Sequence, residues 1–281
     1  IVNMKTDRVM ENYGKAAADI QNIINIIRTA PAPEIPVSSS KVNFTCNVTQ
    51  EEYCKLVEKT KEYIIDGDIF QAVISRQFST PYEGSLINPY RVLRTTNPSP
   101  YMVYLSIDGE EIMSTSPETL VRLENGRLTT FPVAGSRPRG RTPEEDKVLE
   151  KDLLSDEKEL SEHNMLVDLG RNDLGKISNF DSVEVTKYMM IHRYSKIMHI
   201  CSQVESNIRS DCDGLSAIES VLPAGTLSGA PKIRACEIIE ELESEQRGIY
   251  GGALGYLDFT GNLDTCIAIR MAVKKDGHVY V

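Results

Sequence analysis

Two glutamates with helical spacing could hold a metal ion. Glu159 and Glu162 lie in the segment SDEKELSEHNMLVDLGRND, residues 155–173, and a separation of three residues places both side chains on one face of a helix. Two buried carboxylates at this separation repel each other unless a cation or protons compensate. Mg2+ prefers such oxygen ligands and usually takes one or two protein carboxylates together with oxygens of its substrate. The same spacing is also typical of the solvated edge of an amphipathic helix.

The helix that carries these glutamates has a clear start signal. Thr142 is suited to the N-cap, Pro143 to the first helical position and Glu145 to a reciprocal capping contact. Gly170 is suited to the end of the helix. The apolar residues between these points are Leu153, Leu154, Leu160, Met165, Leu166, Val167 and Leu169. A face this wide predicts a helix that is mostly buried.

The segment PAGTLSGAPK, residues 223–232, could bind an anion. Its small residues free the backbone, and Thr226 or Ser228 could cap the helix expected from Lys232 to Leu242. A phosphate or carboxylate fits such a helix N-terminus, and an ordinary capped turn fits the sequence equally well. A second Gly-rich and basic segment, PVAGSRPRGR at residues 132–141, is more typical of a surface turn than of a phosphate loop.

The C-terminal strands contain residues that are unusual in a sheet. Gly251 and Gly252 in GIYGGALGY indicate a bulge or a close approach of another strand or a ligand. Arg270 in CIAIRMAV is expected on the same face as Ala268 and Ala272 of one strand. There it would either face solvent or form a bidentate clamp on a carboxylate.

Two histidines lie in apolar surroundings. His199 belongs to a strand-like segment, YSKIMHICSQV, where a histidine is most often part of the core. His163 follows Glu162 and is expected off the glutamate face, in a structural role.

The composition is that of an ordinary globular protein. The chain has 281 residues, of which 41% are hydrophobic and 26% charged, with a net charge of -10. This charge argues against a nucleic-acid partner, which requires clustered Lys and Arg. No apolar run reaches the roughly 18 residues that a bilayer requires, and no leader sequence opens the chain. The six cysteines form no CxxC pair, so we expect reduced thiols and a cytoplasmic protein without a membrane partner.

The order of elements predicts an α+β fold of antiparallel sheets flanked by helices. Helices are expected over residues 7–28, from a Thr49 N-cap to Asp66, and over 213–221 and 232–242. Strands are expected at 69–80, 101–106, 111–115, 119–124, 127–133, 182–187, 198–205, 250–259 and 264–274. The dipeptides Asp108-Gly109, Asn125-Gly126 and Asp276-Gly277 predict hairpin turns.

The chain is expected to have two parts. Residues 30–40, APAPEIPVSSS, read as a linker. This separates residues 1–45, the end of an N-terminal region, from a main domain over residues 46–281. The chain starts without Met and ends within a hairpin strand, so we expect residues of the same fold beyond Val281.

Eight segments together resemble the chorismate-utilising enzymes, and most closely the large subunit (component I) of anthranilate synthase. They occur in the order of that family and cover nearly everything from residue 60 onward: GDIFQAVISRQF, NPSPYMVYL, SPETLVRL, FPVAGSRPRG, DEKELSEHNMLVDLGRNDLG, KIMHICSQV, LPAGTLSGAPKIRACEIIEELE and RGIYGGALGYLDFTGNLDTCIAIR. The first 45 residues resemble only the end of the family's N-terminal region.

The resemblance implies roles for the residues that do chemistry. Glu159 and Glu162 would bind Mg2+, which would hold the ring carboxylate of chorismate. Glu118 would be the general acid that protonates the departing C4 hydroxyl, a task that needs a raised pKa. His199 would lie near the ring and assist proton movement. Gln71 occupies the position of a Lys base in the water-using relatives, which indicates ammonia as the nucleophile.

The resemblance also implies the contacts of the substrate. Gly135, Ser136 and Thr226 would contact chorismate, and Tyr250 and Arg270 would hold its enolpyruvyl carboxylate. Ala134 replaces the Lys that is typical of aminodeoxychorismate synthase, which places the chain on the anthranilate branch. In the family, tryptophan inhibits at a site that includes the NPSPYM segment, so the resemblance implies inhibitor contacts at Pro100, Tyr101 and Met102.

The implied reaction is amination of chorismate at C2 with loss of the C4 hydroxyl, followed by elimination of pyruvate to give anthranilate. A glutamine amidotransferase subunit (component II) would supply the ammonia. The family continues into a QAGAGIVADS-like segment and a second glutamate pair, so the chain is expected to be a fragment with an incomplete site. Two alternatives stay open: aminodeoxychorismate synthase component I, and a catalytically incompetent core that only binds the glutaminase partner.

Overall fold

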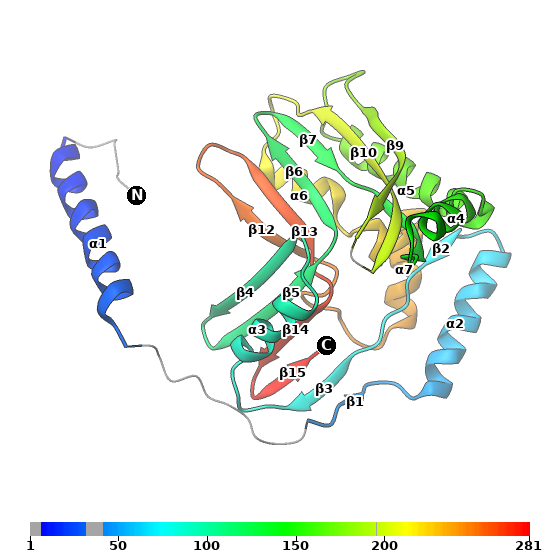
Figure 1. The fold of residues 1–281 in the computed structure, drawn as a ribbon, viewed down its shortest axis with the longest axis horizontal. Helices are drawn as coiled ribbons and strands as arrows, with labels where there is room; N and C mark the ends of the chain where they lie inside the picture. Colours follow the sequence, from blue (N-terminus) through cyan, green and yellow to red (C-terminus); the bar gives the residue numbers. More distant parts are fainter. Residues whose placement is uncertain (1–6, 32–41, 195) are drawn as a thin grey trace. The chain divides into compact units, whose positions relative to one another are not determined.

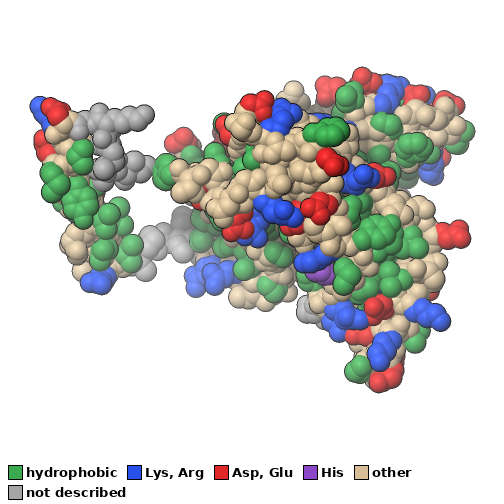
Figure 2. Space-filling view, turned by 90° about the horizontal axis from the view of Figure 1, so that it is seen from above, with side chains coloured by type: hydrophobic (Ala, Val, Ile, Leu, Met, Phe, Trp, Pro, Cys, Tyr) green, Lys and Arg blue, Asp and Glu red, His purple; other side chains and the backbone are tan. Residues whose placement is uncertain are grey.

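The computed structural model describes residues 7–31, 42–194 and 196–281, and the chain divides into two compact units, Ile1–Pro36 and Val37–Val281 (Figure 1). In the described part of the first unit, helix α1 (Val9–Thr29) carries apolar side chains on its surface (Figure 2), and none of its residues is buried. The predicted helix over residues 7–28 is therefore confirmed. The predicted linker lies mostly outside the described residues.

The second unit contains a six-stranded antiparallel sheet. Its strands, in spatial order, are β1 (Thr45–Cys46), β3 (Phe78–Pro81), β15 (His278–Tyr280), β14 (Met271–Lys275), β5 (Glu110–Ser116) and β4 (Tyr101–Ile107). Helix α3 (Ile87–Thr96) packs against β5 and β4 (Figure 1). The chain ends in the hairpin of β14 and β15, whose turn residues Asp276 and Gly277 have φ of 49° and 72°. Positive φ at both positions is what the Asp-Gly dipeptide predicts.

A larger antiparallel sheet of seven strands stands beside the first. Its strands, in spatial order, are β12 (Ala253–Leu257), β13 (Leu263–Ile267), β6 (Thr119–Glu124), β7 (Arg127–Thr130), β10 (Ile197–Asn207) and β8 (Val133–Pro138), and β9 (Glu184–Arg193) pairs with β10. Two short strands, β2 (Gln71–Ala72) and β11 (Gly229–Ala230), pair separately. These pairings confirm the predicted α+β class with antiparallel sheets.

Helices cover the seven-stranded sheet and enclose the main core. They are α4 (Pro143–Leu153), α5 (Glu157–Gly175) and α6 (Gly214–Val221); α2 (Gln50–Ile65) and α7 (Lys232–Leu242) pack in a separate cluster around Ile69 and Ile238. The largest core cluster joins α5 and α6 to strands β6, β7, β10 and β13, and includes Val121, Leu128 and Leu174. The surface alternates acidic and basic side chains on the face drawn in Figure 2. Within the described residues, no helix is long and apolar enough to cross a membrane.

The chain passes between the two large sheets at two neighbouring points. Strand β5 of the first sheet continues through Pro117 and Glu118 into β6 of the second, and β13 of the second continues through residues 268–270 into β14 of the first. Because β5 pairs with β14 and β6 with β13, the two crossings lie side by side. The amide of Ile267 donates to the Glu118 carbonyl at 3.0 Å, and the amide of Thr115 donates to the Arg270 carbonyl at 3.1 Å.

The acidic helix differs from the prediction. Thr142 caps α4 as expected, accepting a hydrogen bond from the Glu145 amide at 3.2 Å, but Glu145 accepts from the Arg141 amide instead of completing a capping box. The helix then breaks, because Asp156 caps a new helix by accepting from the amides of residues 158 and 159. Gly170 does not end this helix, which continues to Gly175.

Three predicted strands are also shorter or interrupted. The segment 69–80 contains only β2 and β3, and β12 starts at Ala253 after a turn that includes Tyr250. The expected strand 264–274 is two strands in different sheets, with Arg270 at φ 47° between them. The prediction that Arg270 shares a strand face with Ala268 and Ala272 was therefore wrong, because alternation does not continue through the crossing.

Candidate functional site

Glu118 lies at the crossing from β5 to β6, where the two sheets bury its carboxyl group. The Thr226 hydroxyl donates a hydrogen bond of 3.1 Å to Glu118 Oε1. Burial raises the pKa of Glu118 to about 7, although the Thr226 hydrogen bond and the positive charge of Arg270 both lower it. A carboxyl group with this pKa holds a proton near neutral pH and can still release it, which is what a general acid requires.

Arg270 and Thr226 approach Glu118 from different segments. Arg270 is exposed at the second crossing, close enough for its charge to lower the pKa of Glu118. Thr226 belongs to the short 3-10 turn η1 (Gly225–Leu227). The predicted capping roles were wrong: Thr226 bonds to Glu118, and Ser228 Oγ donates to the Ala224 carbonyl at 2.8 Å. Helix α7 starts at Lys232, and its N-cap residue, Pro231, makes no side-chain cap. The Thr226 hydroxyl therefore bonds to the Glu118 carboxylate instead of capping α7.

A cavity of about 50 Å³ lies beside Glu118. Glu118, Thr226 and Gly225 form one part of its lining, and Gly170 and Asp173 of α5 form another. This volume is enough for a water-sized ligand and too small for a substrate the size of chorismate. Apolar side chains, among them Leu120, Leu166 and Ile267, form most of the remaining lining.

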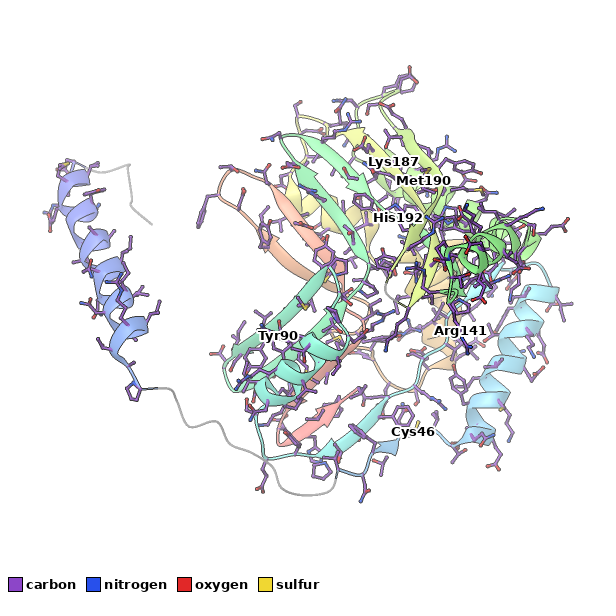
Figure 3. The ribbon with its side chains drawn as sticks, viewed as in Figure 1. Cys46, Tyr90, Arg141, Lys187, Met190 and His192 are labelled. Atoms are coloured by element: carbon purple, nitrogen blue, oxygen red, sulfur yellow. The ribbon has the colours of Figure 1, made fainter. Side chains whose placement is uncertain are left out.

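A second group of candidates lies where β8 and β10 pair. His199 on β10 is opposite Ser136 on β8, and its Nδ1 is 2.9 Å from the Gly135 carbonyl oxygen. A carbonyl can only accept, so Nδ1 is the donor in this hydrogen bond. On the other side, β9 pairs with β10 and places His192 opposite His199; Figure 3 labels His192 among the side chains of β9.

Gly135 allows Glu159 to approach this strand closely. Its φ of 66° favours glycine, and a Cβ atom at this position would lie 3.1 Å from Glu159 Oε2. Ala134, the preceding residue, is buried opposite Ile200. The first turn of α5 therefore lies directly against the strand that carries three predicted substrate contacts.

Glu159 and Glu162 are both partly buried on α5. Arg137 Nη1 lies 3.7 Å from Glu159 Oε1, and the same guanidinium donates to Asp152 at 2.6 Å and to Asp156 at 2.9 Å. In the described part of the chain, the Glu162 carboxylate makes no hydrogen bond or ion pair. Two oxygen donors that share a helix face, one of them uncommitted, fit a cation that takes its remaining ligands elsewhere. Among the described residues, no group of three or more His, Cys, Asp or Glu side chains could hold a metal.

The two groups of candidates meet at Cys201. This residue follows His199 by two positions on β10, and burial raises the pKa of its thiol to about 11, with a smaller contribution from the negative charge of Glu118. Because Cys201 and His199 share one face of β10 and Cys201 is close to Glu118, Glu118 and His199 lie on the same side of this strand.

His163 belongs to the core on the opposite side. It is fully buried, and its Nε2 lies 2.6 Å from Ser202 Oγ.

Gln71 and Tyr250 are held close to the Thr226 turn. Gln71 lies on β2, opposite Ala230 of β11, so its strand pairs with the segment that follows Thr226. Tyr250 belongs to the turn after α7 and is 37% exposed, and partial burial raises the pKa of its phenol.

The side chain of Arg76 stacks over the rings of Tyr53 and Phe78, at 5.1 Å and 5.2 Å from their centroids.

The expected inhibitor segment begins at the same crossing. Tyr101 lies opposite Ser116, and its hydroxyl is 2.9 Å from Thr119 Oγ1 and 2.7 Å from Asp264 Oδ1. Burial raises the pKa of Tyr101. Pro100 and Met102 are exposed. Tyr101 therefore joins the two sheets, and an inhibitor role for these three residues stays a prediction.

Sequence reasoning did not single out the charged residues that support these candidates. Arg137 holds the Glu159 turn, a buried pair of Lys232 and Asp173 has Nζ and Oδ2 2.7 Å apart, and Arg247 contacts the Thr226 turn. The only signal in the sequence is that each basic residue lies within a Gly-rich or Pro-rich motif, SRPRG, GAPK or RGIYGG.

The chain crosses twice between two antiparallel sheets. Glu118, with its raised pKa, lies at one crossing, and a glutamate pair lies on helix α5, which covers the larger sheet. These features define an α+β enzyme core. The family of chorismate binding enzymes matches residues 2–281. The chain belongs to this family, as its motifs predicted.

Individual relatives agree with the narrower resemblance. Anthranilate synthase component 1 of Acetivibrio thermocellus is 56% identical over 237 residues, which are 84% of this chain and 48% of that protein. The Pseudomonas putida protein of the same name is 46% identical over 274 residues, 96% of this chain and 56% of that protein. The chain thus spans about half the length of the curated relatives it matches.

Solved structures show the same fold. Anthranilate synthase component I from Streptococcus pneumoniae TIGR4 matches with a TM-score of 0.85 and 42% identity, covering 94% of this chain and 59% of that one. The menaquinone-specific isochorismate synthase from Escherichia coli matches with a TM-score of 0.75 at 18% identity, covering 96% of this chain and 62% of that one, and supports the fold alone.

Proposed function

We propose that this chain is the greater part of the catalytic domain of an anthranilate synthase large subunit. In this proposal the whole protein converts chorismate and ammonia into anthranilate, pyruvate and water, in the cytoplasm. The observation that carries it is the Glu118 carboxyl group, which burial holds near a pKa of 7 between Thr226 and Arg270. The relatives named anthranilate synthase component 1 supply the reaction.

The first step is amination with loss of water. Ammonia forms a bond to C2 of chorismate, the bond from C4 to its hydroxyl breaks, and Glu118 donates the proton with which that hydroxyl leaves as water. Gln71 replaces a basic lysine with a neutral amide, which favours an added ammonia over an activated water. A glutamine amidotransferase subunit supplies the ammonia, and tryptophan is the proposed feedback inhibitor at Pro100, Tyr101 and Met102.

The second step is elimination of the enolpyruvyl group as pyruvate. The C2 proton leaves, the bond from C3 to the ether oxygen breaks, and the ring becomes aromatic. His199 is placed to accept a proton at Nε2 because Nδ1 is committed to the Gly135 carbonyl. Tyr250 and Arg270 hold the enolpyruvyl carboxylate, and Ala134, Gly135, Ser136 and Thr226 contact the rest of the substrate.

Glu159 and Glu162 are the residues that would hold Mg2+. When bound, the ion supplies positive charge that orients the ring carboxylate and stabilises the charge that develops during the reaction. Glu159 lies against Gly135, which is one of the proposed substrate contacts on β8.

Product identity tests the proposal. The full-length protein is given chorismate, MgCl2 and an ammonium salt, and its products are identified by mass and fluorescence. Anthranilate with equimolar pyruvate supports the proposal. Isochorismate or salicylate would mean that Gln71 does not exclude water, and absence of turnover would favour a core that only binds a glutaminase partner.

The position of the new amino group tests the branch. A 4-amino product from the wild-type protein would identify aminodeoxychorismate synthase. If Ala134 separates the two branches, an Ala134→Lys variant should acquire some 4-amino product. An Ala134→Ser variant, which adds little volume at this buried position, is the matched control and should keep anthranilate as its product.

A further inference from the structure

The side chain of Arg247 connects three segments that are far apart in the sequence. Its Nη1 donates to the Leu227 carbonyl at 2.5 Å, and its Nη2 donates to the Val73 carbonyl at 2.6 Å. Arg247 itself begins the turn in which the Tyr250 amide donates to the Arg247 carbonyl at 3.2 Å. One guanidinium therefore bonds to the β2 segment and to η1 and is part of the Tyr250 turn.

Each of these segments carries a proposed substrate contact close to the point of attachment. Val73 is two residues after Gln71, Leu227 directly follows Thr226, and Tyr250 is three residues after Arg247. The positive charge of Arg247 also reaches the Tyr250 phenol and lowers its pKa against the larger effect of burial. Displacement of the guanidinium would move these contacts together.

Glu243 fixes the guanidinium in place. Arg247 Nε donates to Glu243 Oε2 at 2.8 Å and Nη2 donates to Oε1 at 2.5 Å, which is a bidentate pair. The side chains are 18% and 9% exposed, and Oε1 also accepts from the Ser75 amide at 2.6 Å. Removing one partner of a pair this buried leaves the other charge uncompensated, so the two residues act as a unit.

We infer that Arg247 and Glu243 are a positioning pair that sets Gln71, Thr226 and Tyr250 in register for substrate binding. Through Thr226 the pair also acts on Glu118, which receives the Thr226 hydrogen bond. The inference deepens the proposed function and rests on it for the identity of the substrate. Neither residue touches the reacting atoms.

Arg247→Lys is the informative substitution because lysine keeps the positive charge but lacks the planar guanidinium group with its several donors. An ammonium group is a compact donor on a flexible stem, and it cannot hold two carbonyls and two carboxylate oxygens in one plane. Arg127→Lys is the matched control. Arg127 Nη2 bonds to the partly buried Glu205 at 2.6 Å, between β7 and β10, and contacts none of the proposed substrate contacts.

The test compares Arg247→Lys, Glu243→Gln and Arg127→Lys in the full-length protein by steady-state kinetics with chorismate, well below the melting temperature. An unfolded fraction lowers the apparent kcat and leaves the KM of the folded molecules unchanged, so KM reports the position of the contacts. We expect the KM for chorismate to rise about tenfold in Arg247→Lys and several-fold in Glu243→Gln, and to stay within twofold of wild type in Arg127→Lys.

Amide hydrogen exchange gives a readout that needs no substrate. Arg247→Lys should accelerate exchange in both 73–75 and 226–228, whereas Arg127→Lys should leave these segments unchanged. The inference is overturned if Arg247→Lys and Glu243→Gln both keep the wild-type KM, or if only one of the two segments responds. If Arg247→Lys does not fold, Glu243→Gln decides by the same criteria. A wild-type protein without anthranilate activity would refute the proposed function instead. The hydrogen-exchange result would still test whether Arg247 holds segments 73–75 and 226–228 together.

Discussion

The Thr226 hydroxyl and the Glu118 carboxylate are joined by a hydrogen bond of 3.1 Å across 108 residues of sequence. The bond opposes burial: it favours the charged carboxylate, whereas the two sheets favour the neutral acid. The balance of these effects holds the pKa of Glu118 close to neutral pH. A change on either side should therefore be visible in the pH dependence of the reaction.

Replacing the acid should remove most of the activity. Glu118→Gln keeps the size of the side chain and the contact with Thr226, but it cannot donate a carboxylic proton. General acid catalysis is worth about 10^2 to 10^4 in rate, so kcat for anthranilate formation should fall within that range. Activity within fivefold of wild type, in protein whose melting temperature is unchanged, would exclude Glu118 as the acid.

Removing the Thr226 hydroxyl should shift the pH profile upward. Thr226→Val has nearly the same shape and loses the hydrogen bond that lowers the pKa of Glu118. The acid must be protonated to act, so activity declines as pH rises through this pKa, and the alkaline limb of kcat should move to higher pH. Thr186→Val, which removes a threonine hydroxyl that bonds to the Gln203 carbonyl on the neighbouring strand, is the control. A limb that is unchanged or moves to lower pH would contradict the assignment.

Glu118 should also make folding stability depend on pH. Its folded pKa of about 7 lies above the ordinary value of 4.5, so the folded state binds this proton more tightly than the unfolded state. The resulting stabilisation is complete below pH 4.5 and is lost as pH rises through 7, a difference of about 3 kcal/mol for this change in pKa. Urea unfolding at pH 5 and pH 8 should show a smaller decrease for Glu118→Gln than for wild type; equal decreases would argue against the shifted pKa.

The glutamate pair should control magnesium affinity. In the full-length protein, Glu159→Gln and Glu162→Gln should each weaken Mg2+ binding at least about tenfold, because each removes one hard oxygen ligand. Glu157→Gln makes the same charge change on an exposed position of the same helix and should alter affinity less than about twofold. Isothermal titration calorimetry measures the Mg2+ affinity of all three variants. Equal effects would mean that Glu159 and Glu162 act only through their negative charge and are not ligands.

Gly135 should be required for the glutamate position as well as for the strand. Gly135→Ala forces an alanine to φ 66°, which costs about 1 kcal/mol or more, and adds a Cβ 3.1 Å from Glu159 Oε2. Gly109→Ala has the backbone cost alone, since φ there is 86° and no atom lies within 4 Å of the added Cβ. Both should lower stability in denaturant unfolding, and only Gly135→Ala should also weaken Mg2+ binding; similar magnesium affinities would contradict the contact.

Local sequence signals determined the hairpins and helix starts. Asp108-Gly109 and Asn125-Gly126 adopt positive φ at both positions, and Thr49 is the predicted N-cap, forming a capping box with Glu52. These signals work because each depends on the conformational freedom of one or two residues or on a side chain that bonds to its own turn. The order of the motifs also indicated the family, which the comparisons confirmed.

Signals that depend on distant contacts were misread. Periodicity continued through Leu154 to Asp156 and through Ala268 to Arg270, yet α4 and α5 are separate helices and β13 and β14 belong to different sheets. Apolar periodicity reports which residues are buried, but not against which layer. Capping chemistry at Asp156 and the pairing partners of β14 decided both breaks.

The sequence by itself determined which residue types were available for chemistry: a glutamate pair at helical spacing, an acid in SPE, and glycines where the backbone must approach closely. Tertiary structure alone decided which of them meet. Only the two adjacent sheet crossings bring Glu118 and Arg270 together, and only the η1 turn supplies Thr226 to the same carboxylate. A pKa near 7 requires burial by two sheets whose strands are more than a hundred residues apart, and no local pattern encodes that environment.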